Sequence, residues 1–234
     1  VSPEYRSELL HADAEFESAV NGYLAQVAGM TDPCAIALKL HDLLCKDITY
    51  VLQASNAHNA YGALVEHEAV CEGYARAYQL LLNRAGIESF VVTGSSKGQG
   101  HAWNMVKLGN DWVQTDVTWD DQVTDTYHYY FASTSAQMAE DHTMTVLPYA
   151  LPNCTTTDYR CFTVELGNSF STLTVDGVAA LMKPTKDGRT CALEYTGTEP
   201  IMDWLGENAV AVIQKLGGTG SFGYFVAWLG KEYH

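Results

Sequence analysis

Glu68-Ala69-Val70-Cys71-Glu72-Gly73-Tyr74-Ala75-Arg76-Ala77 is the stretch around which the chain is organised. Cys71 stands where an irregular segment gives way to a predicted helix, and Gly86 is the residue expected just after its last turn. A cysteine at a helix start faces unpaired N–H groups that stabilise a thiolate. Cys71 is therefore a candidate nucleophile, although an isolated cysteine in a helix more often belongs to a core.

A predicted β-hairpin lies downstream of this helix. Gly109-Asn110 separates two runs with strand character, and such a dipeptide is typical of a two-residue hairpin turn. The register that this turn sets places Asp116 opposite Ala102 or Trp103, one step from His101. The hairpin alone is thus expected to bring a carboxylate beside an imidazole.

A thiol, an imidazole and a carboxylate in this order make up a nucleophilic triad. His101 is expected to take the proton of Cys71, and Asp116 to hold the ring in one tautomer and orientation. The backbone N–H of Cys71 is one expected oxyanion donor, and Tyr61 or Asn59 the second. Taken singly, a histidine on a strand and an aspartate at a turn are ordinary surface or structural residues.

Two tryptophans flank the candidate site. Period-two alternation puts Trp103 on the same face of its strand as His101, and Trp119 follows the end of the returning strand. Both are predicted to wall a substrate cleft, with core packing as the alternative. Gly73 is expected to permit close approach of another backbone segment.

The remaining chain predicts an α+β architecture with two parts. Residues 1–152 form a catalytic domain that includes N-terminal helices, and residues 153–234 form a small α/β subdomain of unknown role. In the first part we expect helices over 2–28, 33–47 and 135–139, strands over 89–93 and 127–131, and loops over 51–67 and 94–100. In the second we expect strands over 160–166, 190–195 and 222–229 and helices over 175–182 and 199–216.

Composition excludes several classes of protein. The 234 residues are 47% hydrophobic and 18% charged, which suits a globular core. A net charge of −15 argues against nucleic acid as a partner, because phosphate binding needs clustered Lys and Arg. No apolar run approaches the roughly 18 residues of a membrane span. The first residue is Val, which is compatible with an exported chain that has lost its leader.

The six cysteines contain no CxxC pair. If Cys71 is a free nucleophile, at most two disulfides form; a bond between Cys34 and Cys45 is excluded because eleven residues of helix span roughly 16 Å. The feasible bridges are Cys154–Cys161 or Cys161–Cys191, and an all-thiol chain is the alternative.

Neither a metal nor a cofactor is predicted. His58, His67, His128 and His142 lack the spacing of metal ligands. Asp120-Asp121 and Asp125 are interpreted as a solvated acidic turn.

Three blocks of the sequence together resemble the signature of the transglutaminase-like cysteine enzymes, with the bacterial extracellular branch closest. These are Val70 to Ala75, His101-Ala102-Trp103-Asn104 and Asp116-Val117-Thr118-Trp119-Asp120. The similarity covers roughly residues 35–145, and three further groups also fit it: His41-Asp42-Leu43 with Tyr50, Tyr61 to Leu64, and Tyr130-Phe131 with Asp141-His142. It implies a papain-like α+β fold in which the Cys71 helix packs on an antiparallel sheet.

The resemblance also implies acyl transfer, with Cys71 as nucleophile, His101 as base and Asp116 as orienter. We expect a peptide or protein substrate, in an extracellular or cell-surface setting such as the cell envelope, and hydrolysis in preference to cross-linking by a lysine amine. The calcium sites of the animal cross-linking enzymes cannot be placed on this sequence. A non-catalytic scaffold on the same fold and a structural, disulfide-bonded Cys71 are the competing hypotheses.

Overall fold

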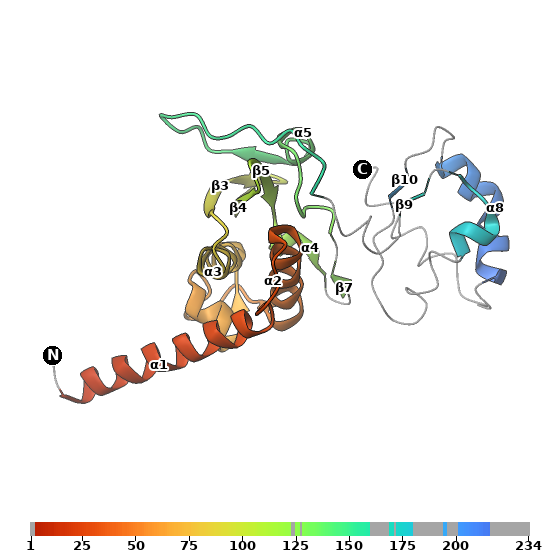
Figure 1. Cartoon of the computed structure of the whole chain (residues 1–234). Helices are drawn as coiled ribbons and strands as arrows, with labels where there is room; N and C mark the ends of the chain where they lie inside the picture. Colours follow the sequence, from red (N-terminus) through yellow and green to blue (C-terminus); the bar gives the residue numbers. More distant parts are fainter. Residues whose placement is uncertain are drawn as a thin grey trace. The chain divides into compact units, whose positions relative to one another are not determined.

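The computed structural model describes residues 3–122, 125–126, 128–159, 169–170, 172–179, 194–195 and 201–215. The chain divides into two compact units, Val1–Cys161 and Phe162–His234 (Figure 1). The sequence placed the division at 152–153. Cys154 nevertheless lies buried in the core of the first unit, and its carbonyl accepts a hydrogen bond from the backbone of Ser135 (2.7 Å).

Three helices of the first unit begin where local sequence rules place them, and the first ends at Ala25, three residues before its predicted end at residue 28. They are α1 (Pro3–Ala25), α2 (Pro33–Asp47) and α3 (Cys71–Arg84). The side chain of Asp32 caps α2 by accepting from the backbone N–H of Cys34 (3.0 Å). Gly29 and Gly86 follow α1 and α3 with φ of 83° and 84°, the left-handed conformation that ends helices.

An antiparallel sheet of four strands forms the centre of the first unit, in the order β5-β4-β3-β8. Its strands are β3 (Ser89–Ser96), β4 (Gln99–Leu108), β5 (Asp111–Thr115) and β8 (His142–Met144). The β4–β5 register pairs Leu108 with Asp111 and Asn104 with Thr115, which confirms the hairpin predicted from Gly109-Asn110.

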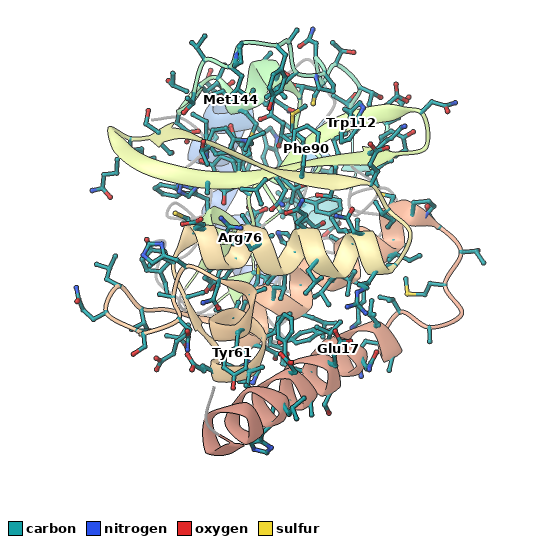
Figure 2. All side chains as sticks on the ribbon, turned by 90° about the vertical axis from the view of Figure 1, so that its left-hand side faces the viewer. Glu17, Tyr61, Arg76, Phe90, Trp112 and Met144 are labelled. Carbon is teal, nitrogen blue, oxygen red and sulfur yellow. The ribbon has the colours of Figure 1, made fainter. Side chains whose placement is uncertain are left out.

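The sheet is covered on both faces. Figure 2 shows α3 running between the sheet and α1, and Asn104 of β4 donates a side-chain hydrogen bond to the carbonyl of Ala75 (2.9 Å). Phe90, Trp112 and Met144 lie on the face away from α3. They pack around a buried cluster of Val92, Trp103, Met105, Met138 and Cys154. The α+β class with a helix on an antiparallel sheet is thereby confirmed.

Gly73 brings α3 against the loop before it. A Cβ added there would lie 2.3 Å from the carbonyl oxygen of Ala57 and 2.8 Å from the Cβ of Ala69. The same carbonyl accepts a hydrogen bond from the backbone N–H of Val70 (2.9 Å). The predicted close approach is confirmed, and it fixes the position at which α3 begins.

Three predictions of local structure were wrong. Residues 94–100 are not a loop, because β3 and β4 continue to a tight turn at Lys97-Gly98. The segment 51–67 is not wholly irregular, since it contains the π-helix η1 (Gly62–Glu66), between β1 (Thr49–Tyr50) and β2 (Glu68–Ala69). Residues 128–131 form turns instead of a strand. In the first case the pairing of β3 with β4 overrides local composition.

Short elements complete the first unit. They are α4 (Val117–Asp120), β6 (Asp121–Gln122), β7 (Asp125–Thr126) and α5 (Ser135–Met138). The described part of the second unit contains a parallel pair, β9 (Ser169–Phe170) with β10 (Glu194–Tyr195), and the helix α8 (Ile201–Lys215). The helix predicted over 199–216 is confirmed, and the strands predicted over 160–166 and 222–229 lie outside the described residues.

Candidate active site

Cys71 is the first residue of α3, and its thiol is half-buried and free. No side chain caps this helix start, where Val70 is the N-cap residue. The N–H groups of the first turn therefore remain available to a negative charge. The hypothesis of a structural, disulfide-bonded Cys71 is wrong.

His101 lies between the thiol and a buried carboxylate. Its Nε2 is 2.6 Å from Oδ2 of Asp116, and its side chain is 8% exposed. Burial lowers the pKa of His101, but hydrogen bonds and charge from Asp116 and Cys71 outweigh burial and raise it to about 9. Because Nε2 is engaged by Asp116, Nδ1 is the nitrogen left to face the thiol. The structure thus brings together the three residues that the sequence singled out.

The two oxygens of Asp116 have different partners. Oδ1 accepts the backbone N–H of Trp119 (3.2 Å), so that Asp116 is the N-cap of α4. Oδ2 is left for imidazoles, and hydrogen bonds from His101 and His142 hold the pKa of Asp116 below its usual value although burial alone would raise it. Asp116 therefore has two roles: one oxygen caps α4, and the other accepts hydrogen bonds from the histidines.

The two predicted tryptophans take different positions. Trp103 is buried, its ring stacks on His101 with centroids 5.9 Å apart, and its Nε1 donates to Gln114 (2.8 Å). It supports the imidazole from behind and does not wall a cleft. Trp119 is half-buried, contacts His101 edge-on at 6.0 Å and has the ammonium of Lys97 4.0 Å from its ring centroid.

The side chains of both oxyanion candidates from the sequence have hydrogen-bond partners outside the triad. The Tyr61 hydroxyl donates to Glu15 of α1 (3.0 Å), and Figure 2 shows Tyr61 beside that helix. The Asn59 side chain accepts from Gly62 (3.0 Å) and lines a groove of about 460 Å³ with residues of α3. Tyr50 lies closer to the site: burial, followed by the charge of Cys71, raises its pKa.

Sequence reasoning also missed His142 as part of the site. Its Nε2 lies 2.9 Å from Oδ2 of Asp116, and its Nδ1 lies 2.5 Å from Oδ1 of Asp141. It comes from β8, 41 residues after His101 and on the far edge of the sheet order. The pairing of β8 with β3, which places His142 opposite Ser96, is what brings it there.

The acidic turn predicted at Asp120 is instead a buried polar cluster. Asp120 is fully buried, its Oδ2 lies 3.1 Å from Nε2 of His41, and its Oδ1 accepts the backbone N–H of Tyr130 (3.0 Å). Nδ1 of His41 lies 2.9 Å from Asp42, which also bonds His128 (2.7 Å). The cluster ties α2 to α4, the helix that Asp116 caps.

Two groups of residues have the composition of a metal-ligand set. His41, Asp42 and His128 form one, and His101, Asp116 and His142 form the other. In each group the nitrogen and oxygen atoms already lie 2.6–2.9 Å apart as hydrogen-bonded pairs. Hydrogen bonding alone therefore explains why these side chains lie together. Spacing along the sequence could not reveal either group, because each draws on residues far apart in the chain.

The cysteines differ from the predicted pairing. Cys34 is disulfide-bonded to a partner outside the described residues, whereas Cys45 and Cys154 are buried free thiols. A Cys154–Cys161 bridge was therefore wrong, and the alternative Cys161–Cys191 bridge falls outside the described residues.

Fold and site together define an α+β protein with a cysteine, histidine and aspartate assembled at the start of a helix. Residues 21–117 match the model of the Transglutaminase-like superfamily. Among the described residues no helix combines the length and the apolar character that crossing a membrane requires.

Parts of the chain are also similar to two curated proteins and to two solved structures. The chain is 29% identical to the kyphoscoliosis peptidases of Homo sapiens and Mus musculus over 125 residues, which cover 42% of this chain and only 19% of each relative. A crystal structure of a TGase has a TM-score of 0.42 at 15% identity, over 61% of this chain and 38% of that one. A protein from Cytophaga hutchinsonii, described as a candidate cysteine protease, has a TM-score of 0.40 at 18% identity, over 44% and 37%.

Proposed function

We propose that this chain is a cysteine-dependent acyl-transfer enzyme that acts on amide bonds of peptides or proteins. One observation carries the proposal: His101 holds a 2.6 Å contact to a buried carboxylate on one nitrogen and interacts with the Cys71 thiol at a helix start on the other side. An imidazole oriented in this way is suited to accept the thiol proton.

The reaction follows from these positions. Nδ1 of His101 takes the proton of Cys71, and the thiolate sulfur bonds to the amide carbonyl carbon. The N–H of Cys71 donates to the developing oxyanion, with the Tyr50 hydroxyl as the second donor that we propose in place of Tyr61 and Asn59. When the C–N bond breaks, His101 returns its proton to the leaving amine, which leaves a thioester.

Hydrolysis is the outcome that we propose for the thioester. Water gives up a proton to His101 as its oxygen bonds to the acyl carbon, and the C–S bond breaks to release a carboxylic acid and the Cys71 thiol. The name of the curated relatives, a peptidase, supports water as the acceptor. A lysine amine as acceptor would instead give a cross-link.

We also propose an extracellular or cell-surface location. The disulfide at Cys34 supports it, because such bonds persist in oxidising compartments.

Alkylation of the thiols tests the proposal. The chain supplies its own controls, since Cys45 and Cys154 are free but buried. Iodoacetamide labelling, located by mass spectrometry of peptides, is expected to be at least tenfold faster at Cys71 at pH 6–7 and to slow to the rate of an ordinary thiol in His101→Ala, as expected for an imidazole-activated thiolate. Slow labelling of wild-type Cys71 that rises only near pH 8.5, the ordinary thiol range, would favour a non-catalytic scaffold.

A second assay separates the two acyl acceptors. A glutamine peptide supplied with and without a primary amine is expected to release ammonia equally in both cases and to yield the acid. Incorporation of the amine as the main product would contradict hydrolysis.

A further inference from the structure

His142 is a buried histidine that the proposed reaction does not use. It stands at the start of β8, and both of its ring nitrogens meet carboxylate oxygens: Nε2 meets Asp116 at 2.9 Å and Nδ1 meets Asp141 at 2.5 Å. The ring is held edge-on by Trp103 (centroids 5.0 Å apart) and by Tyr130 (5.3 Å).

The protons of this arrangement follow from donor and acceptor chemistry. Ionised carboxylates only accept hydrogen bonds, so each nitrogen of His142 that faces one must carry a hydrogen. His142 is then an imidazolium between Asp116 and Asp141. Oδ2 of Asp116 in turn accepts from two imidazoles, since His101 also approaches it at 2.6 Å.

We propose that His142 is a positioning residue of the site, which holds the Asp116 carboxylate toward His101 and offsets part of its charge. This inference rests on the proposed Cys71 chemistry. Oδ1 of Asp116 is engaged by the backbone of Trp119, and His142 gives Oδ2 a second fixed partner, so the carboxylate cannot rotate away from His101. The adjacent cation also weakens the hold of Asp116 on the proton of His101, which must be passed to the leaving amine.

The charged groups around His142 come from four segments. Asp116 follows β5, Asp141 directly precedes His142, and His101 of β4 lies with its ring centroid 5.4 Å away. The hydroxyl of Tyr130 donates to Oδ2 of Asp141 (2.5 Å), which keeps the other oxygen for His142. The chain of contacts therefore runs from Tyr130 through both carboxylates to His101, and through His101 to the thiol.

Two substitutions of His142 each keep one of its two hydrogen bonds and remove the other. In His142→Gln the amide nitrogen falls near the place of Nε2 and keeps a donor for Asp116. In His142→Asn it falls near the place of Nδ1 and keeps only the donor for Asp141. The proposal predicts that His142→Asn lowers kcat by roughly 10- to 100-fold at unchanged KM, a typical cost of losing a positioning contact, whereas His142→Gln stays within about threefold.

The dependence of kcat/KM for amide hydrolysis on pH supplies a readout that a purely structural role would leave unchanged. Removing the cation in His142→Gln strengthens the hold of Asp116 on the His101 proton, which the leaving amine needs, so the alkaline decline of kcat/KM is expected to move to higher pH. Thermal unfolding of both variants serves as the control. The proposal would be overturned if kcat fell in proportion to Tm in both variants and the pH profile did not shift.

The protonation of His142 can also be tested on the wild-type protein, so this test does not depend on the folding of a variant. Nitrogen-15 NMR of the histidine rings at pH 7 is expected to show hydrogens on both nitrogens of His142, and a ring with one bare nitrogen would overturn the inference. The proposed function fails in a different way, through slow labelling of wild-type Cys71 and no amide hydrolysis while the His142 signals stay as expected.

Discussion

Replacement of Asp116 by Asn is the sharpest perturbation that the site offers. Asn caps a helix about as well as Asp, so α4 keeps its start if the amide oxygen takes over the contact with the backbone N–H of Trp119 (3.2 Å). The amide nitrogen must then occupy the place of Oδ2, where it points a donor at the hydrogens on His101 and His142. The substitution keeps the shape of the side chain and reverses its hydrogen bonding.

The expected magnitude comes from the environment of His101. Its pKa of about 9, against an ordinary 6.5, corresponds to about 3 kcal/mol of preference for the imidazolium, in which the Asp116 hydrogen bond is the largest favourable cause. Loss of that preference amounts to roughly 100-fold in rate, and a ring forced into the wrong tautomer raises the loss to about 10⁴-fold in kcat. We therefore expect a loss of between 10²- and 10⁴-fold with little change in KM.

The assay is initial-rate hydrolysis of a glutamine peptide, with the alkylation rate of Cys71 as a readout that needs no substrate. Asp111→Asn is the matched control, because Asp111 begins the strand that Asp116 follows, is exposed and is far from the imidazoles in the register. A folded Asp116→Asn protein that keeps its activity and its alkylation rate within threefold of wild type would refute the role assigned to this carboxylate.

Three further outcomes follow from the packing and charges of the first unit. Gly73→Ala places a Cβ against a backbone carbonyl, so we expect a loss of about 2–4 kcal/mol in urea unfolding, against near-neutral Gly100→Ala, where nothing lies within 4 Å. Folding raises the pKa of His101, so the protonated ring stabilises the folded state by about 3 kcal/mol. This contribution is complete below pH 6.5 and is lost as the pH rises through about 9. The free energy of unfolding in urea should fall across this window in the wild type but not in His101→Ala. Asp120→Ala leaves Nε2 of the buried His41 ring without its carboxylate partner and is expected to cost about 3–5 kcal/mol. A change below about 0.5 kcal/mol would instead support the solvated turn that the sequence predicted at Asp120.

The sequence alone determined the features of this protein that depend on near neighbours. The helix that begins at Cys71, the Gly109-Asn110 turn and the register of its hairpin follow from capping, turn chemistry and alternation, and the structure reproduces each of them. His101 and Asp116 could be expected to meet for the same reason, since one short hairpin carries both.

Only the tertiary structure decided what surrounds these groups. His142 reaches Asp116 because β8 joins the sheet beside β3, and Asp120 is buried because α2 presents His41 to it across 79 residues of sequence. Tyr61 bonds Glu15 across 46 residues of sequence, a contact that composition does not predict. Contacts between residues so distant in sequence leave no local pattern, because the geometry that brings them together is set by the packing of whole elements and not by the residues beside them.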